Sequence, residues 1–132
     1  MSVPFKPDSY TAVSPYLLVD GAEHLLAFLE QVFDAQRLRC YAGPDGRYMH
    51  AEVRIADSVV MLADVPANDT VPAHLHVYVP DVDATYARAL AAGATPVRAP
   101  EKGHDPDKRG GFRDASGTTW WVGTQLELHP GA

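Results

Sequence analysis

Three histidines and one carboxylate alternate with apolar residues in two stretches of the chain. His50 and Glu52 lie two residues apart, as do His74 and His76. On a strand, side chains two apart share a face at a spacing of about 6.5–7 Å, which two arms of a chelate can bridge. These four residues therefore form a candidate divalent-metal site of imidazole and carboxylate ligands. The other interpretation is that His50 and Glu52 form a polar cross-strand pair near Arg54.

Glu52 has a second possible chemistry. A carboxylate inside an aromatic-lined cavity can have a raised pKa and serve as a general base. It can equally pair with a cation, and Arg54 or Arg113 would be the partner. Glu52 is therefore the one candidate catalytic residue, with ion pairing as its alternative.

The surroundings of these residues are rich in aromatic and sulfur-containing side chains. Period-2 alternation places an apolar set on one side of the expected strands, suited to packing against helices. Val13, Leu17, Val53, Leu62 and Trp120 are among its members. The opposite side carries the candidate ligand-binding residues, which are Ser14, Tyr16, His50, Glu52, Met61, His74, His76, Tyr78 and Trp121. A flat sheet would expose a large apolar patch there, so we expect the sheet to curl into a cup that holds a small molecule.

The elements that position these residues occur twice. Residues 11–64 read strand (12–19), helix, strand, strand, strand, with tight turns at 43–46 and 56–58. Residues 74–126 repeat that order after a Pro- and Asn-containing linker at 65–73. Helix-period patterns at 22–33 and 83–92 supply the two helices. Each half is too short to bury its own sheet. We therefore predict one domain over residues 1–132 with an α+β fold. Two paired βαβββ modules form a curved eight-stranded mixed sheet, with helices on the side that faces away from the cup.

Two further segments have distinctive compositions. Residues 2–8 are proline-rich and predict an extended arm over the domain. Residues 96–111 are charged and rich in Gly and Pro, which favours a mobile hairpin, and part of it, 99–111, is a candidate lid over the cup.

Charge and composition exclude several classes of protein. The net charge of −6 repels polyphosphate and argues against nucleic-acid binding. Cys40 is the single cysteine, so no intrachain disulfide is possible, and a reducing compartment fits. Residues 1–15 have no apolar run typical of a signal peptide or membrane span. A cytoplasmic protein with no membrane association is expected.

Several strings of residues together resemble one protein family. They are Tyr16-Leu17-Leu18-Val19-Asp20, residues 50–62 from His50 to Leu62, residues 74–84 from His74 to Ala84, Ala91-Ala92-Gly93-Ala94-Thr95, Asp107-Lys108-Arg109-Gly110-Gly111 and residues 114–120 from Asp114 to Trp120. Their order and spacing are similar to the glyoxalase/bleomycin-resistance/dioxygenase superfamily, also called vicinal oxygen chelate, and most similar to its PhnB-like branch. Ala115-Ser116 departs from the family's usual Pro-Phe.

The resemblance implies where a metal would lie. Metal-dependent members carry four ligands on the first and last strands of each module, and these positions correspond here to Ser14, Met61, His74 and Trp121. A thioether and an indole contribute almost nothing to binding a hard or borderline cation. The resemblance therefore implies that the inherited metal site is lost, and that Met61 and Trp121 suit a flat or apolar ligand instead.

Two functions follow as hypotheses. The first is a metal-independent protein that binds or sequesters an aromatic or amphipathic small molecule and needs no cofactor. The second is a lyase, isomerase or dioxygenase that uses a displaced metal at His50, Glu52, His74 and His76, or Glu52 acid–base chemistry. A weaker third is an interaction module. The resemblance also implies a homodimer with cups near the interface.

Overall fold

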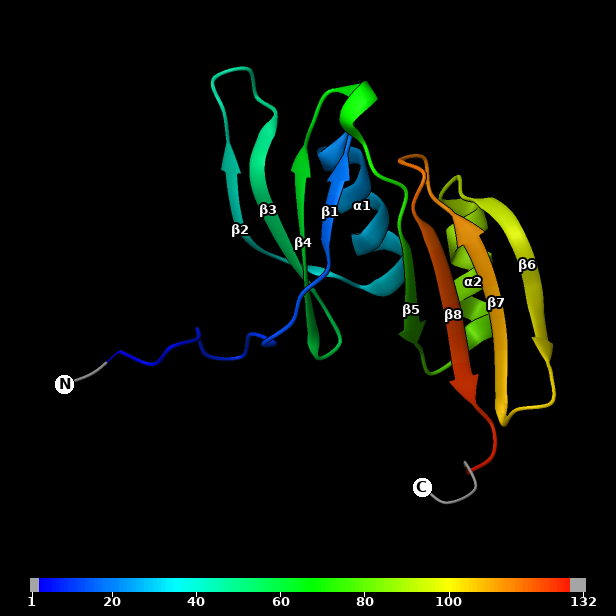
Figure 1. Cartoon of the computed structure of the whole chain (residues 1–132). Coiled ribbons are helices and arrows are strands. Elements are labelled where there is room, and N and C mark those ends of the chain that lie inside the picture. Colours follow the sequence, from blue (N-terminus) through cyan, green and yellow to red (C-terminus); the bar gives the residue numbers. More distant parts are fainter. Residues whose placement is uncertain (1–2, 129–132) are drawn as a thin grey trace.

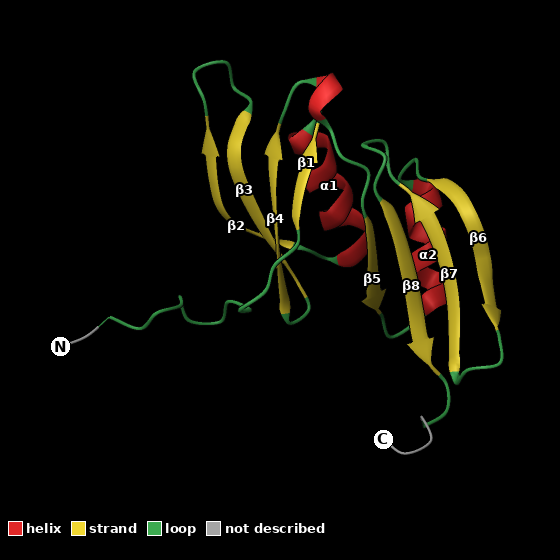
Figure 2. Cartoon of the chain, viewed as in Figure 1, coloured by secondary structure: helices red, strands yellow, loops and turns green. Residues whose placement is uncertain are grey.

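Each half of the chain builds one four-stranded mixed sheet with one helix packed on it (Figures 1 and 2). The computed structural model describes residues 3–128. The first module contains β1 (Tyr16–Val19), α1 (Ala22–Phe33), β2 (Gln36–Ala42), β3 (Tyr48–Ile55) and β4 (Ser58–Asp64). A short 3₁₀ turn (Ala67–Asp69) follows, and the second module contains β5 (His74–Tyr78), α2 (Val82–Ala91), β6 (Thr95–Lys102), β7 (Asp107–Arg113) and β8 (Thr119–Gln125). The predicted α+β fold of two βαβββ modules is confirmed.

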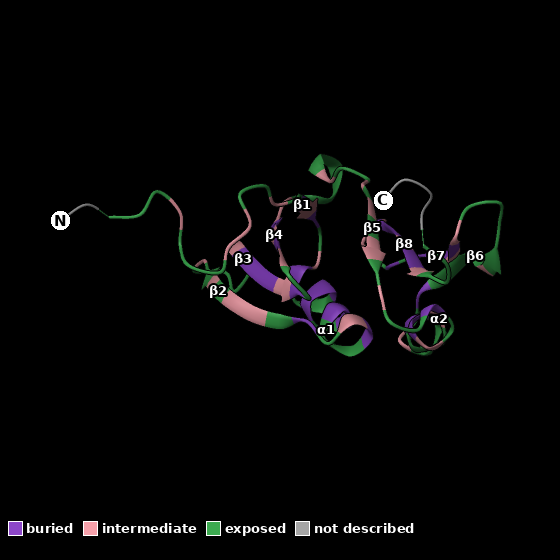
Figure 3. Ribbon diagram, turned by 90° about the horizontal axis from the view of Figure 1, so that it is seen from below, coloured by how far each residue is buried: buried purple, intermediate pink, exposed green. Residues whose placement is uncertain are grey.

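The two sheets have the same strand order. The first runs β1-β4-β3-β2 and the second β5-β8-β7-β6, with the first pair of each sheet parallel and the others antiparallel. Among the described residues, the strands hydrogen-bond as two sheets of four rather than as one sheet of eight. The sheets lie side by side, and both helices cover the same side of them (Figure 3). The face of each sheet opposite its helix is called the outer face below.

Asp64 at the end of β4 fixes the start of α1. One of its carboxylate oxygens accepts hydrogen bonds from the backbone N–H groups of Gly21 and Ala22, at 2.9 and 2.8 Å, and the other accepts from Tyr48 N at 2.9 Å. Gly21 has a φ of +104°, which an L side chain rarely adopts. A carboxylate at a helix N-terminus also interacts favourably with the helix dipole. The first module is therefore tied together at one buried acid.

An aromatic cluster joins the modules on their helix side. Phe33, at the end of α1, lies 5.2 Å from Trp120 and 6.1 Å from Phe112 between ring centroids. Phe28 and Tyr86 contact Phe112 as well. Trp120 and Phe112 are completely buried. The helix of one half thus helps to bury the sheet of the other, as the shortness of each half predicts.

The predicted division of side chains between the faces is largely confirmed. Leu17, Val53, Leu62 and Trp120 are buried on the helix side. Val13 was placed there too, but it is 85% exposed because β1 begins only at Tyr16 and residues 12–15 are not a strand. The predicted first strand over residues 12–19 is therefore too long at its start.

The hairpin expected at residues 96–111 is present, but its two arms are strands of the second sheet. Most of this segment is the antiparallel pair β6 and β7, and only residues 103–106 form the connecting turn. Pro96 and Pro100 are tolerated because β6 is an edge strand, where a missing N–H breaks no interior ladder. The pairing of β6 with β7 is irregular between Pro96 and Glu101. The candidate lid at 99–111 is thus mainly sheet.

Candidate functional site

A buried carboxylate stands at the centre of the first module's outer face. Glu52, on β3, is 1% exposed. Its Oε1 accepts hydrogen bonds from Tyr10 Oη at 2.5 Å and from Arg39 Nε at 3.2 Å, and its Oε2 lies 2.8 Å from His50 Nε2. Donors from three parts of the chain therefore satisfy it, as a buried charge requires.

The arginine that pairs with Glu52 is not one of those predicted from the sequence. Neither Arg54 nor Arg113 pairs with it, and Arg39 on β2 does. Burial alone would raise the pKa of Glu52, but the hydrogen bonds from Tyr10, His50 and Arg39 outweigh it and hold that pKa below its usual value. A carboxylate that stays ionised is a weak base. The prediction of a raised pKa and a general-base role for Glu52 therefore lacks support in the structure.

His50 is oriented by Glu52. Its Nε2 points to the carboxylate and therefore carries a proton, and in the neutral imidazole Nδ1 is then an acceptor. Tyr16 Oη lies 3.4 Å from Nδ1, and the Tyr16 and Tyr41 rings lie 5.7 and 6.4 Å from the imidazole. The predicted polar pair of His50 with Glu52 is thus present, and it extends to the half-exposed Tyr16.

Residues 9–11 of the N-terminal arm, residues 3–14, contact this part of the outer face and supply Tyr10. The start of the arm runs away from the sheets (Figure 1). The Tyr10 ring lies 5.1 Å below the Arg39 guanidinium and 6.0 Å from that of Arg54. Arg54 also donates to Ser9 O at 2.5 Å. Ser14, a predicted ligand-binding residue, belongs to the arm rather than to β1, and its hydroxyl lies 3.4 Å from Thr11 Oγ1.

The outer face of the second module carries an aromatic plate instead. The Trp121 and His74 rings are almost coplanar, at 13°, and Trp121 Nε1 donates to His74 Nδ1 at 3.1 Å. Gly111 lies under the indole: a Cβ at that position would come within 2.6 Å of the ring. The glycine therefore lets the indole lie flat on the sheet, with His74 extending the flat surface.

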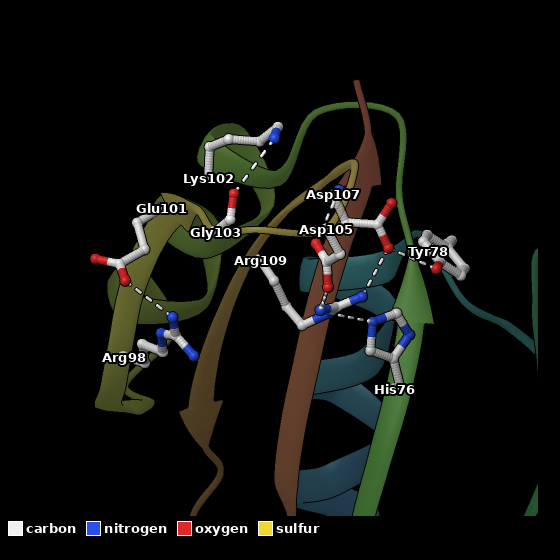
Figure 4. A network of polar contacts seen from close by, with 9 residues as sticks. All are labelled: His76, Tyr78, Arg98, Glu101, Lys102, Gly103, Asp105, Asp107 and Arg109. Carbon is white, nitrogen blue, oxygen red and sulfur yellow. Dashed lines mark hydrogen bonds and ion pairs between the residues drawn. The ribbon is translucent and has the colours of Figure 1, made fainter. Parts of the chain in front are cut away.

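Beside the plate, Arg109 organises a polar network (Figure 4). Its guanidinium donates to His76 Nε2 at 3.0 Å, to Asp105 Oδ2 at 2.9 Å and to Asp107 Oδ2 at 2.6 Å. Tyr78 donates its hydroxyl to the same Asp107 oxygen at 2.6 Å. Burial, and then the nearby Arg109 charge, lower the pKa of His76. His76 is held here as a neutral acceptor.

Eight of the nine predicted ligand-binding residues thus fall into two groups, and the ninth, Ser14, lies in the arm. Tyr16, His50, Glu52 and Met61 share the outer face of the first sheet, where Met61 is the register partner of both Tyr16 and Glu52. His74, His76, Tyr78 and Trp121 lie on β5 and β8 of the second. Both outer faces look to the same side of the molecule, so one chain does not bring the two groups face to face (Figures 1 and 3).

The four residues of the displaced-metal hypothesis are divided in the same way. His50 and Glu52 are in contact, while His74 and His76 are hydrogen-bonded to Trp121 and Arg109 in the other module. Within residues 3–128, no three His, Cys, Asp or Glu side chains are placed to share one metal ion.

A cleft of about 360 Å³ opens between the modules, away from most of these residues. It lies between the turn joining β3 to β4 and strand β5, and its lining is largely apolar, from Val13, Val60, Leu75, Val77 and Trp120 among others. His76 and Tyr78 are the predicted site residues that border it. Its volume is in the range of small-molecule sites.

Sequence reasoning missed Tyr10, Arg39, Asp107, Arg109 and Gly111. Arg109 follows Lys108 and gave no alternation signal, whereas Arg39 lies between the less polar Leu38 and Cys40, which was a usable signal for the outer face. Gly111 in a strand was another, because an interior strand glycine often marks a close approach. Nothing local in the proline-rich arm indicated that Tyr10 would reach Glu52.

The fold and the paired modules define a class of protein, and comparison with known sequences agrees. The sequence profile of the Glyoxalase/Bleomycin resistance protein/Dioxygenase superfamily matches residues 9–122, so the chain belongs to this superfamily, as its motifs predict. Uncharacterized proteins of Mycobacterium bovis and Mycobacterium tuberculosis are 40% identical over 124 residues, which cover 85% of this chain and 82% and 73% of the relatives, respectively.

Solved structures show the same fold. TioX from Micromonospora sp. ML1 has a TM-score of 0.69 at 22% identity, covering 87% of this chain and 100% of its own. The PhnB protein of Bacillus cereus, a putative 3-demethylubiquinone-9 3-methyltransferase, has a TM-score of 0.72 at 19% identity and coverages of 86% and 99%. The fosfomycin resistance protein FosX from Mesorhizobium loti has a TM-score of 0.65 at 20% identity, with coverages of 86% and 91%. At these identities the likeness concerns the fold alone.

Proposed function

We propose that this protein is a metal-independent binder of a flat aromatic or amphipathic small molecule. The observation that carries the proposal is the coplanar Trp121–His74 plate over Gly111. A planar ligand that stacks on an indole gains contact area and a favourable ring geometry. In the metal-dependent members that the motifs resemble, the positions of Met61, His74 and Trp121 supply metal ligands, and of these three side chains only the imidazole is a good donor.

A matched pair of variants tests the proposal. A thermal-shift screen of planar aromatic compounds on the full chain should yield hits, each raising the melting temperature through binding to the native state. Trp121→Ala should abolish the shift, whereas Phe5→Ala, which removes a 96% exposed ring from the arm, should leave it intact. A set of hits that both variants bind equally would contradict the proposed plate.

The absence of a resident metal is part of the same proposal and needs its own measurement. Elemental analysis of protein purified without chelator should find no stoichiometric Ni, Zn, Mn or Fe. Titration with each ion should leave the melting temperature unchanged. A one-to-one metal content together with a rise of several degrees would overturn metal independence. FosX from Listeria monocytogenes, which has the same fold, has been crystallised with Mn(II), so it is a suitable positive control.

A second function is favoured by the contact between His50 and Glu52. A buried carboxylate that orients an imidazole leaves Nδ1 as an acceptor, which is the arrangement of an acid–base pair. In an enzyme of the lyase or isomerase kind, His50 would then be the base and Glu52 the group that positions it. Turnover of a bound compound that His50→Ala abolishes without weakening binding would favour this function over simple sequestration.

A homodimer fits the way the binding residues are divided. The outer faces of one chain lie side by side, and β1 and β5 are sheet edges in the described part of the chain. A second copy would close a cup by placing the outer face of one module opposite the other's. Light scattering should report about twice the chain mass of 14.3 kDa, and a species at 14.3 kDa alone would contradict dimerisation.

The remaining expectations stay predictions. None of the helices in residues 3–128 is long and apolar enough to cross a membrane. The acidic net charge of −6 continues to argue against nucleic acid as a partner. A cytoplasmic location is proposed from the lone cysteine, which fits a reducing compartment.

A further inference from the structure

The side chain of Tyr10 occupies a site built almost entirely by other elements. Arg39 on β2 and Arg54 on β3 place guanidinium groups near its ring, and Glu52 on β3 receives its hydroxyl. A cation near the face of an aromatic ring attracts it, and more strongly when water is excluded. The sheet therefore presents two cations for a ring and one anion for a hydroxyl, the complement of a phenol.

The arm that delivers Tyr10 is weakly attached. None of residues 3–14 belongs to the buried core cluster. Outside Tyr10, two hydrogen bonds join the arm to the sheet: Arg54 donates to Ser9 O, and Val59 N donates to Thr11 Oγ1 at 3.3 Å. Phe5 and Val13 are 96% and 85% exposed. Segments with few buried apolar contacts open at low free-energy cost.

We infer that the outer face of the first module is a binding site for a phenolic ring, and that Tyr10 fills it until a ligand displaces the arm. The inference rests on the proposed small-molecule function and adds to it a ligand class, a hydroxylated aromatic ring, and a competing internal occupant. The ligand hydroxyl replaces that of Tyr10 as the donor to Glu52, so the buried carboxylate keeps three partners throughout the exchange.

The site selects the protonated hydroxyl. Glu52 is ionised, and a phenolate at the same place would leave two adjacent anions with no proton between them. The structure shows the same preference in Tyr10: its hydrogen bond to Glu52, and then burial, raise the Tyr10 pKa. A neutral alkylphenol should therefore bind, and a nitrophenol that is ionised in weakly alkaline buffer should not.

The first test removes the internal occupant. Tyr10→Ala vacates the place of the phenol ring beside Arg39 and Glu52, and 4-methylphenol should bind there and raise the melting temperature of the variant. The unmodified chain should bind the same probe at least about tenfold more weakly, because a tethered Tyr10 competes at an effective concentration of about a millimolar or more. Toluene, which has the ring without the hydroxyl, should bind the variant far more weakly than 4-methylphenol.

Two controls isolate the site. Tyr41→Ala removes a 55% exposed tyrosine from the same module and leaves Tyr10 in place on Glu52. This variant should bind 4-methylphenol no better than the unmodified chain. In Tyr10→Ala combined with Glu52→Gln, the preference for 4-methylphenol over toluene should fall. Equal binding of the probe by Tyr10→Ala and the unmodified chain would overturn the inference.

A second measurement needs no substitution and covers the case in which Tyr10→Ala fails to fold. Chymotrypsin cleaves after tyrosine, and Tyr10 is protected while its side chain lies on Glu52. Saturating 4-methylphenol should accelerate cleavage after Tyr10 in the full chain, while toluene should not. An unchanged cleavage rate at saturating probe would also overturn the inference.

The outcomes separate this inference from the proposed function. If planar ligands bind through Trp121 while 4-methylphenol neither binds Tyr10→Ala nor releases the arm, the plate stands and the phenol site does not exist. If 4-methylphenol binds the single variant Tyr10→Ala and the double variant carrying Tyr10→Ala and Trp121→Ala equally well, the phenol site stands without the plate.

Discussion

The two modules share one scaffold but carry opposite chemistry on their outer faces. By strand register, Glu52 faces Met61 in the first module and Gly111 faces Trp121 in the second, while Met61 and Trp121 pair with Tyr16 and His76. Glu52 and Gly111 therefore occupy equivalent positions. At this position the first module has the buried carboxylate of Glu52, which Tyr10 of the arm contacts. The second module has a glycine, which leaves room for the Trp121 indole.

The comparison shows that the two faces of each sheet are under different constraints. On the helix side both modules need apolar side chains, because the halves bury each other there. On the outer side each sheet tolerates a charge, a ring or a glycine at one register position, provided that its neighbours satisfy it. Recognition can thus differ between modules without any change in the backbone.

The largest expected effect is the difference between two single variants, in which one or the other of two adjacent tryptophans is replaced by alanine. Trp120 is fully buried and donates its indole N–H to Asp114 at 2.7 Å, so Trp120→Ala should cost about 3–5 kcal/mol of unfolding free energy. Trp121 lies on the outer face, and Trp121→Ala should cost about 1 kcal/mol or less while abolishing ligand binding. Urea denaturation with a binding assay checks both. Similar losses of stability would contradict the assignment of faces.

The next effect concerns the carboxylate that distinguishes the first module. Glu52→Ala leaves the partly buried Tyr10 hydroxyl and His50 Nε2 without their acceptor and should cost about 1–3 kcal/mol. The arm should also detach, which amide exchange can follow at residues 9–11. Glu101→Ala is the control, because its pair with Arg98 is exposed and should contribute less than about 1 kcal/mol.

Acid should weaken the first module before the second, because the two carboxylates with lowered pKa values in the first module are buried, whereas Asp105 in the second, whose pKa is also lowered, is exposed. The pKa values of Glu52 and Asp64 lie below their ordinary values of 4.5 and 3.8, so the folded state holds these protons less tightly than the unfolded state. Their stabilisation is complete above those ordinary values and is lost as pH falls through the lower folded pKa values. Hydrogen exchange should rise first in β3 and β4 below about pH 4. Glu52→Gln should flatten the dependence, whereas a uniform response of both modules would contradict it.

The smallest change in stability, and a sharp change in binding, is expected at Gly111. A Cβ there would meet the Trp121 ring at 2.6 Å, so Gly111→Ala should lift the indole off the sheet. Because Trp121 is on the surface, the ring can move at a cost within about 1 kcal/mol. Planar ligands should bind at least about tenfold more weakly. Gly103→Ala, where a Cβ would meet nothing, is the matched control.

Much of the fold could be predicted because it is written in local patterns. The helix over 22–33 matches α1, and the turns around Gly43–Gly46 and Ala56 fall where their residue types favour reversal. Composition misled at residues 96–111, where Pro and Gly usually indicate a loop but an edge strand accommodates them. The predicted first strand begins too early because Ala12 and Val13 continue its apolar alternation.

The candidate site was harder to predict than the fold. The residues of each outer face follow from period-2 alternation, and eight of the nine predicted binding residues lie on the expected strands. Their partners do not follow from it, because Tyr10 with Glu52 and Arg109 with His76 are contacts between residues 42 and 33 positions apart. Which cation meets which acid depends on bulges and strand pairing that the alternation does not specify.

The aromatic cluster around Phe33 has a practical consequence for any search for ligands. Because this ring packs against both Phe112 and Trp120, neither half can lose its structure without exposing part of the other, and a melt should show a single cooperative transition. A compound resting on either sheet would then delay the collapse of both. Melting curves of the unmodified chain will therefore detect bound compounds without locating them. Locating them requires variants or residue-resolved data.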